Sequence, residues 1–313
     1  MKILITDKVH ELLVDGLKKD GHEVIYNTAV SMNDLASFLP SLDGIIINSK
    51  IIMNKTMIDL APKLLFIARL GSGMEIIDVL YAKEKEIMCI NTPDGNCDAV
   101  AEHAIGMLLA FANNLVRANS EVKSMIWNRE ANRGFELMGK SIGIIGVGHT
   151  GSALAKKLRG FGMEIYGYDK YKTDFGADMD HVFVSTLGEI QSKCDIISFH
   201  LPLSDETKYI VNSKFLHLCH NKPVIINTSR GNVINTQDLL SALQSCVVSA
   251  ALLDVFENEK VNTYNKNELE IYDRLFSLQN VLVSPHIAGW SKESLERISQ
   301  LTLQRIRYSL EKR

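Results

Sequence analysis

Short apolar runs alternate with amphipathic segments along most of the chain. In the first hundred residues, five runs rich in Ile, Leu and Val are separated by stretches with apolar residues at helical spacing. The runs cover 2–6, 23–26, 44–48, 64–68 and 87–90, and the helical stretches cover 11–19, 32–39 and 54–60. Short, wholly apolar strands that alternate with helices are typical of a parallel sheet covered on both faces. The pattern therefore predicts an α/β fold.

A second series of the same kind begins near residue 140. Its expected strands cover 141–145, 163–168, 195–199, 223–227, 248–253 and 281–284. Between the two series, segment 99–116 has one apolar stripe at helical spacing, made of Val100, His103, Ala104, Met107, Leu108 and Phe111. The last segment, 291–312, is also helical in pattern, and Ser291 is its expected N-cap. We expect the first of these helices to open a second domain and the last to return to the first domain.

The most specific motif is the glycine-rich stretch Gly146-Val-Gly-His-Thr-Gly151. It follows the expected strand 141–145 and opens the helical stretch 152–159, and the next expected strand ends at Asp169. A strand, a Gly-x-Gly-x-x-Gly turn, a helix, a second strand and an acidic residue together form the fingerprint of dinucleotide binding. The surrounding pattern makes this assignment far stronger than the glycines alone would.

Each residue of the fingerprint has a physical role. Gly146 permits the tight turn, Gly148 lets the backbone approach a pyrophosphate, and Gly151 lets the helix pack closely on the strand. The free N–H groups at the start of the helix attract phosphate. Asp169 would accept a hydrogen bond from a ribose 2′-hydroxyl and repel a 2′-phosphate, so the expected cofactor is NAD and not NADP.

Composition and charge narrow the class of protein. The 313 residues are 46% hydrophobic and 23% charged, with a net charge of −3 and a pI near 6.3, which argues against nucleic-acid or membrane partners. The five cysteines are scattered and lack CxxC spacing, so neither a metal site nor a disulfide framework is expected. Asp7 interrupts the N-terminus too early for a signal peptide, and the apolar run 104–112 is too short to span a bilayer. We expect a cytoplasmic protein.

Polar side chains at the ends of strands are the candidates for chemistry, because ligands of open α/β sheets bind there. A nicotinamide enzyme that acts on a 2-oxo or 2-hydroxy acid needs three groups. These are a cation for the substrate carboxylate, a proton donor for the carbonyl oxygen and a carboxylate that orients this donor. Arg230, His286 and Glu259 could fill these roles in that order. By residue type alone, the arginine could equally form a surface ion pair, the histidine could be structural, and Glu259 could belong to a solvated acidic stretch.

The strand-end segments, taken in order, resemble the D-isomer-specific 2-hydroxyacid dehydrogenase family over nearly the whole chain. The matching segments are 69–73, 91–96, 99–103, 146–151, 200–202, 227–231, 253–259 and 284–289. The resemblance implies a Rossmann-type NAD-binding domain, residues 98–286, inserted into a flavodoxin-like substrate domain made of 1–97 and 287–313, with a cleft between the domains. It also implies a homodimer joined through the NAD domain and the helix near 99–116.

The resemblance also implies the site residues. The catalytic residues would be Arg230, Glu259 and His286, and no metal is expected. The cofactor would contact Ser72, Gly146, Gly148, His149, Thr150, Gly151, Asp169, Leu201, Pro202, Thr228, Ser229, Arg230, Asp254, His286 and Gly289. The substrate, a small 2-hydroxy or 2-oxo acid, would contact Lys50, Arg69, Gly71, Ser72, Gly73, Arg230 and His286.

The chain departs from the family pattern at three places. His149-Thr150 stands where Arg-Ile is frequent, so the pyrophosphate would lose a cation. Lys260 stands where proline is common, which should leave the loop after Glu259 less rigid. Asn48 stands where an arginine is usual, and Lys50 could replace the missing charge or could be an ordinary solvated lysine.

The substrate is the least determined part of the prediction. Within the family the chain is most similar to the phosphoglycerate dehydrogenase group of serine biosynthesis, in a short form without a C-terminal regulatory domain. A glyoxylate or hydroxypyruvate reductase is the alternative, and Trp290 could line the substrate pocket or serve packing alone. A formate dehydrogenase is disfavoured, because that branch has Gln in place of Glu259. In a different class, an NADH-sensing, corepressor-like binding protein is disfavoured by the intact Arg230, Glu259 and His286, as is an inactive relative.

Overall fold

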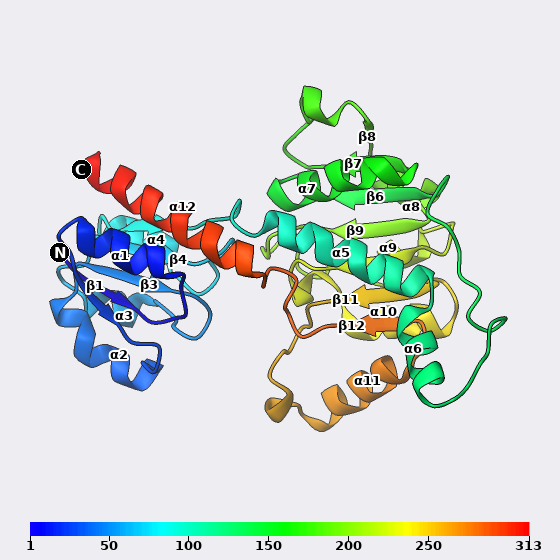
Figure 1. The fold of residues 1–313 in the computed structure, drawn as a ribbon, viewed down its shortest axis with the longest axis horizontal. Helices are drawn as coiled ribbons and strands as arrows, with labels where there is room; N and C mark the ends of the chain where they lie inside the picture. The colour runs from blue at the N-terminus through cyan, green and yellow to red at the C-terminus, as the bar shows by residue number, and fades with distance from the viewer. Residues whose placement is uncertain (313) are drawn as a thin grey trace. The chain divides into compact units, whose positions relative to one another are not determined.

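The computed structural model describes residues 1–312, and these residues fold into two compact units. Unit 1 is Met1–Cys97 with Trp290–Arg313, and unit 2 is Asp98–Gly289. The second break comes after Gly289 and not after His286, because the buried Asp254 carboxylate of unit 2 binds the backbone N–H groups of Ile287 and Ala288 at 3.0 and 2.8 Å. Figure 1 shows the elements of each unit.

Unit 1 contains a five-stranded sheet in the order β2-β1-β3-β4-β5, and all its strand pairs are parallel. The strands are β1 (Lys2–Ile5), β2 (Glu23–Tyr26), β3 (Gly44–Ile47), β4 (Phe66–Arg69) and β5 (Met88–Ile90). This strand order is that of the flavodoxin-like doubly wound fold. The helices are α1 (Glu11–Lys19), α2 (Met32–Phe38), α3 (Lys55–Asp59), α4 (Val79–Glu84) and α12 (Lys292–Glu311).

Side chains of the unit 1 strands alternate between two apolar cores, one on each face of the sheet. Leu4 packs in one core and its neighbours Ile3 and Ile5 pack in the other. The second core also receives residues of α1 and of the C-terminal helix α12, which lie together in Figure 1. These two helices approach closely, since a Cβ on Gly16 would lie 2.3 Å from a Leu303 methyl carbon. The last helix therefore packs on the first unit, with Ser291 as its N-cap, as the sequence predicts.

Unit 2 contains a seven-stranded parallel sheet in the order β12-β11-β10-β9-β6-β7-β8. The strands are β6 (Ser141–Ile145), β7 (Glu164–Tyr168), β8 (Val182–Val184), β9 (Ile196–Phe199), β10 (Val224–Asn227), β11 (Ala250–Leu253) and β12 (Val281–Val283). Counted from β6, six of them follow the Rossmann order 3-2-1-4-5-6, and a seventh is added at one edge. The predicted α/β fold class is confirmed. Only β8 was not expected, because it has three residues and two of them are exposed.

The helices of unit 2 cover both faces of this sheet (Figure 1). They are α5 (Cys97–Ala112), α6 (Leu115–Lys123), α7 (His149–Leu158), α8 (Leu187–Lys193), α9 (Ser213–His217), α10 (Thr236–Gln244) and α11 (Lys266–Ser277). The single helix expected over 99–116 is wrong at its end. Asn114 has the left-handed φ of 53°, which ends α5 and lets α6 begin in a new direction. No described helix is by itself long and apolar enough to cross a membrane, although α5 and α6, bent by 59°, meet that criterion when joined.

Candidate active site

The glycine turn between β6 and α7 has the geometry that the motif requires. Gly146 has a φ of +93°, and a Cβ there would lie 2.4 Å from the carbonyl oxygen of His200. A Cβ on Gly151 would lie 2.1 Å from the carbonyl oxygen of Gly146, so the helix can reach the turn only with glycine at this position. Beside Gly148, by contrast, the space is open. Gly146 and Gly151 are needed to build the turn, and the open space beside Gly148 leaves room for a ligand.

Asp169 lies directly against this turn. Its Oδ2 accepts a hydrogen bond from the backbone N–H of Val147 at 3.0 Å, and its Oδ1 accepts one from the N–H of Tyr171 at 2.9 Å. Each carboxylate oxygen keeps a second lone pair for a ribose hydroxyl. Lys172, which the sequence reasoning missed, donates from Nζ to the Val147 carbonyl at 3.0 Å. A cation therefore stands at the same turn, three positions after the acid.

The residues around the turn fit a bound dinucleotide. Gly148 is the N-cap of α7 and supplies no side-chain cap, so the N–H groups of the first turn remain available to a pyrophosphate. Thr228, at the end of β10, has a buried Oγ1 without a hydrogen-bond partner among the described residues. Leu201 lies beside Gly146, since its methyl carbon would be 3.1 Å from a Cβ there. His149 is exposed at the start of α7.

Replacing Asp169 with Ala is expected to erode the preference for NAD over NADP by about tenfold, because a charge-assisted hydrogen bond and a repulsive charge are both lost. The ratio of kcat/KM for NADH and NADPH measures this effect. Asp169→Asn is the matched control, since the amide oxygen can still accept a bond from the turn while the charge is gone. An unchanged ratio in both variants would remove Asp169 from cofactor selection.

Arg230 is positioned by a tight loop at the end of β10. The Asn227 side chain accepts hydrogen bonds from the N–H and hydroxyl of Ser229 at 3.0 and 2.8 Å, and donates to the Arg230 carbonyl at 3.0 Å. The Arg230 guanidinium donates to the Ser229 carbonyl at 2.7 Å. The next residue must be glycine, because a Cβ on Gly231 would lie 1.9 Å from the backbone of Phe256. The β10 loop is thereby pressed against the loop that carries Glu259.

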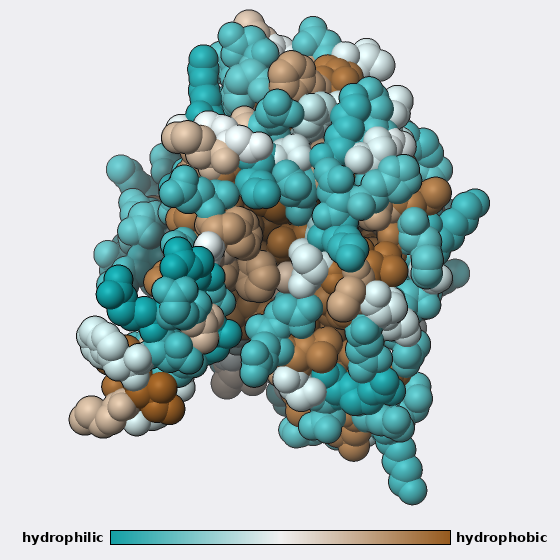
Figure 2. Space-filling view, turned by 90° about the vertical axis from the view of Figure 1, so that its right-hand side faces the viewer, coloured by the Kyte–Doolittle hydropathy of each residue, from teal (hydrophilic) through white to brown (hydrophobic). Residues whose placement is uncertain are grey.

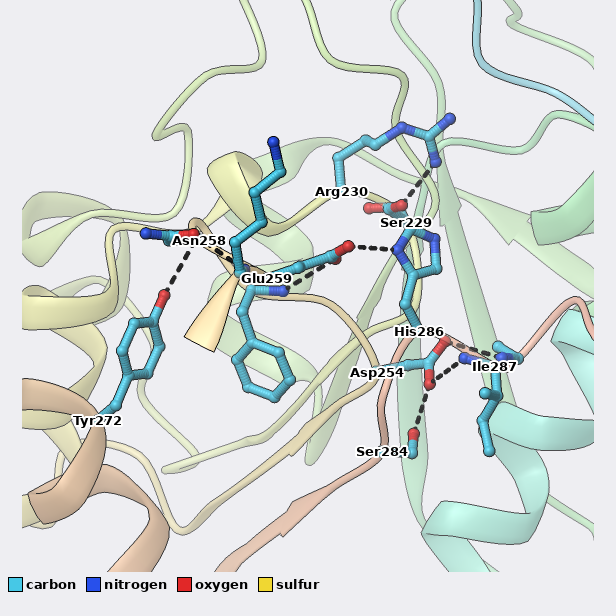
Figure 3. A network of polar contacts seen from close by, with 12 residues as sticks. Ser229, Arg230, Asp254, Asn258, Glu259, Tyr272, Ser284, His286 and Ile287 are labelled. Atoms are coloured by element: carbon cyan, nitrogen blue, oxygen red, sulfur yellow. Dashed lines mark hydrogen bonds and ion pairs between the residues drawn. The ribbon is translucent and has the colours of Figure 1, made fainter. Parts of the chain in front are cut away.

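Glu259 and His286 form a hydrogen-bonded pair. The Glu259 Oε2 lies 2.8 Å from the His286 Nδ1, and both side chains are about half exposed. Figure 3 shows their side chains beside Arg230, on the loops that follow β10, β11 and β12. These strands are neighbours in the sheet and run parallel, so their carboxyl ends meet at one edge. The structure brings the three predicted catalytic residues together.

The loop that carries His286 is held by Asp254. His286 itself has a left-handed φ of +55°, and its N–H donates to the Asp254 carbonyl at 2.8 Å. The Asp254 carboxylate is fully buried and accepts hydrogen bonds from the hydroxyl of Ser284 and from two N–H groups of the loop. These contacts give Asp254 a role within the protein, and its cofactor contact stays a prediction.

The loop that carries Glu259 has Lys260 where proline is common in the family, and hydrogen bonds of Asn258 hold this loop. The Asn258 N–H donates to the Tyr272 hydroxyl at 3.1 Å, and its carbonyl accepts from the Tyr264 hydroxyl at 3.0 Å. The Asn258 amide also donates to Glu268 at 3.0 Å. Tyr264 and Tyr272 stack with ring centroids 4.7 Å apart. The substitution at Lys260 thus leaves a loop that aromatic side chains, partly from α11, hold in place.

A second strand-end histidine, His200, is unsuited to proton transfer at neutral pH. Burial lowers the pKa of His200 from 6.5 to about 4, and its Nδ1 is buried without a partner among the described residues. Its Nε2 contacts the Ser198 hydroxyl at 2.9 Å. His200 therefore remains neutral, and its backbone carbonyl helps to shape the glycine turn.

In unit 1, the predicted substrate residues lie after β4 and β3. Gly71 has a φ of +125°, and a Cβ there would lie 2.3 Å from the Arg69 guanidinium, so the arginine folds back over its own loop. The loop is fixed to the end of β5, where Thr92 accepts from the Gly71 N–H and Asn91 donates to the Ser72 carbonyl. Lys50 donates from Nζ to the Thr28 carbonyl at 2.6 Å.

Asp7 is the unexpected charge near these residues. Its carboxylate accepts from the Asn48 N–H at 3.0 Å and from the Thr6 hydroxyl at 2.6 Å. A negative charge therefore lies beside the position where the family usually has an arginine. Asp7 follows β1 and Asn48 follows β3, and these two strands are neighbours in the sheet. Among residues 1–312, no group of three or more His, Cys, Asp or Glu side chains is placed to hold a metal ion.

The fold and the strand-end geometry define a dinucleotide-binding α/β protein of two units. Residues 105–288 match the sequence model of the family described as D-isomer specific 2-hydroxyacid dehydrogenase, NAD binding domain. The chain belongs to this family, as the sequence predicts.

Relatives with curated names cover nearly all of the chain. It is 33% identical to the hydroxypyruvate reductase of Thermotoga maritima over 93% of this chain and 95% of the relative. It is 32% identical to the D-3-phosphoglycerate dehydrogenase of Methanocaldococcus jannaschii over 98% of this chain and 57% of the relative. The chain thus spans little more than half the length of that relative. A solved D-lactate dehydrogenase from Aquifex aeolicus, complexed with NAD and lactic acid, matches with a TM-score of 0.85 and 26% identity over 100% of this chain and 96% of that one.

Proposed function

We propose that this protein is an NAD-dependent D-2-hydroxyacid dehydrogenase that interconverts a 2-oxo acid and its D-2-hydroxy acid. The observation that carries the proposal is the 2.8 Å pair of Glu259 and His286 beside Arg230, at the edge of the sheet where the glycine turn also lies. A proton donor oriented by a carboxylate, next to a guanidinium, is the set of groups that reduction of a 2-oxo acid needs.

Each catalytic side chain has one task. NADH, when bound, supplies the hydride. Glu259 can only accept hydrogen bonds as a carboxylate, so Nδ1 of His286 carries its proton toward Glu259 and leaves Nε2 for the substrate. The imidazolium donates the Nε2 proton to the carbonyl oxygen, and in the oxidation direction the neutral Nε2 takes the hydroxyl proton. Arg230 binds the substrate carboxylate with two parallel N–H groups.

Two substrates are candidates. Sequence motifs and several relatives named D-3-phosphoglycerate dehydrogenase favour 3-phosphohydroxypyruvate. The contacts in unit 1 favour unphosphorylated hydroxypyruvate instead, because Asp7 adds negative charge beside Asn48 and Lys50 is engaged by the Thr28 carbonyl. A relative that matches over 95% of its own length is named hydroxypyruvate reductase.

Oxidation of NADH with 3-phosphohydroxypyruvate, hydroxypyruvate and glyoxylate distinguishes these candidates. If Lys50 binds phosphate, Lys50→Ala is expected to raise KM for the phosphorylated acid alone, by about tenfold, as loss of a charge-assisted bond predicts. Lys55→Ala is the matched control, since that exposed lysine contacts the Tyr81 ring. An equal KM in both variants would mean that Lys50 does not bind phosphate. No turnover with any 2-oxo acid would overturn the dehydrogenase and favour an NADH-binding module.

We also propose a homodimer joined through unit 2. Apolar side chains are exposed on α6 and on the connection to β6, namely Leu115, Val116, Val122, Met125, Ile126, Trp127, Phe135 and Met138. Met125 is 94% exposed and Trp127 is 79% exposed. Figure 2 shows hydrophobic atoms reaching the surface on this side, around a hollow. Monomeric proteins rarely expose so many neighbouring apolar groups.

Sedimentation of the protein in solution measures its oligomeric state and so tests the proposed dimer. Met125→Glu with Trp127→Glu is expected to shift the protein from dimer to monomer, because charge is costly in an apolar interface. Leu80→Glu is the control, since Leu80 is 78% exposed and belongs to unit 1, not to this surface of unit 2. A monomeric parent protein would contradict the dimer, and so would an unchanged dimer in the double variant.

A further inference from the structure

His103, on helix α5 of unit 2, contacts the group that holds the catalytic loop. Its Nε2 lies 2.8 Å from the Ser284 hydroxyl and 3.6 Å from the Asp254 carboxylate. The Ser284 hydroxyl lies 2.5 Å from the same carboxylate. The histidine side chain is 23% exposed and the aspartate is fully buried. A chain of polar contacts therefore runs from α5 to the loop that follows β12, and Figure 3 shows its Ser284, Asp254 and Ile287 members.

The donors and acceptors of this chain can be assigned by counting protons. A carboxylate only accepts, so the single hydroxyl proton of Ser284 points to Asp254. The Ser284 oxygen must then accept from His103, which places a proton on Nε2 of that ring. In this arrangement each of the three groups has a partner, and the N–H of His103 leaves the Ser284 hydroxyl proton to Asp254.

The loop needs such support because of its backbone. His286 has a φ of +55°, a conformation that a residue with a side chain adopts at a cost and keeps only where its surroundings hold it. The holding contacts are the hydrogen bonds from the N–H groups of Ile287 and Ala288 to the Asp254 carboxylate. Ser284 binds the same carboxylate and starts the loop, so its orientation affects both ends of the segment that carries the imidazole.

We infer that His103 is a positioning residue for His286, and that it acts through Ser284 and Asp254. The inference rests on the proposed dehydrogenase function, in which the His286 ring must meet the carbonyl oxygen. His103 does not touch the reacting atoms in this scheme. Its hydrogen bond keeps the carboxylate and the left-handed loop in one arrangement, and misplacement of a catalytic group by about 1 Å can lower a rate by about a hundredfold.

The alternative is that His103 serves only packing, since it shares a helical stripe with the buried Val100, Ala104 and Met107. Two substitutions separate these roles because they act in opposite directions. His103→Leu keeps an apolar side chain on the stripe and removes the hydrogen-bond donor. His103→Gln loses the ring and keeps an N–H group near the position of Nε2. A packing role predicts that Leu is tolerated better, and a positioning role predicts that Gln is.

Steady-state kinetics with NADH and the best 2-oxo acid test the inference. We expect His103→Leu to lower kcat about tenfold with KM for NADH within about twofold, and His103→Gln to keep kcat within about threefold, since only the former loses a hydrogen bond to the network. Ser284→Ala should match His103→Leu. The control is His217→Leu, because the exposed His217 makes its hydrogen bonds to Ser213 of its own helix. A wild-type kcat in His103→Leu, or a lower kcat in His103→Gln than in His103→Leu, would overturn the inference.

A second measurement keeps this test separate from the proposed function. NMR spectra of histidine-labelled protein report the His286 ring without any turnover. We expect the His286 signals to shift in His103→Leu and Ser284→Ala and to stay near the parent positions in His103→Gln. An inactive parent protein would refute the dehydrogenase alone, whereas unshifted His286 signals in His103→Leu would refute the positioning role.

Discussion

Replacement of His286 with Ala is expected to lower kcat for reduction of a 2-oxo acid by about a thousandfold, the size of effect typical for loss of a general acid. The dissociation constant of NADH should stay within about twofold, because the ring acts on the substrate oxygen. Stopped-flow turnover and fluorescence titration with NADH measure the two quantities. The loss should be large because the other strand-end histidine, His200, has its pKa lowered to about 4 by burial and cannot replace the donor.

Glu259→Gln provides the matched control for His286. In the parent protein the Glu259 carboxylate lies 2.8 Å from Nδ1 of His286. The glutamine oxygen can still accept this hydrogen bond, but the negative charge beside the ring is lost. We expect a smaller loss of kcat, about a hundredfold, because the ring stays oriented while the charge beside it is removed. A normal rate in His286→Ala would refute the assignment of the proton donor.

Arg230→Lys is expected to lower kcat/KM for the 2-oxo acid by about a hundredfold, although the positive charge is retained. Lysine lacks the planar fork that binds a carboxylate through two parallel hydrogen bonds, so the substrate carbonyl would be poorly oriented toward His286. The effect should appear in both kcat and KM, and NADH binding should change little. Initial rates over a range of acid concentrations provide the measurement.

The control for this substitution is Arg307→Lys. Arg307 also binds a carboxylate through two nitrogens, with Asp20 at 2.7 and 2.9 Å, but it is a partly exposed residue of α12 in unit 1. Its replacement should leave the kinetic constants unchanged. Equal kinetics for Arg230→Lys and the parent protein would show that Arg230 does not bind the substrate through its fork.

The parts of this protein that the sequence predicted well are local in origin. The alternation of apolar runs with amphipathic stretches specifies strands and helices because each element buries its own apolar side chains. The turn from Gly146 to Gly151 is set by three glycines within one segment, and each fills a role that a side chain would prevent. Helix α12 was predicted with its N-cap at Ser291 for the same reason. Where local signals were weak, as in the three-residue strand β8 and at the Asn114 break, prediction failed.

Long-range contacts decided the rest. Nothing in the sequence around Glu259 shows that its carboxylate meets His286, because the pair forms only when β11 and β12 lie side by side. Residue pattern placed His103 among apolar core residues, and only the packing of α5 against the β12 loop brings it to Ser284. The sequence by itself determined most of the elements, the nucleotide turn and the candidates for the catalytic groups. The tertiary structure decided which groups meet and what holds them there, since these contacts depend on sheet register and helix packing between distant segments.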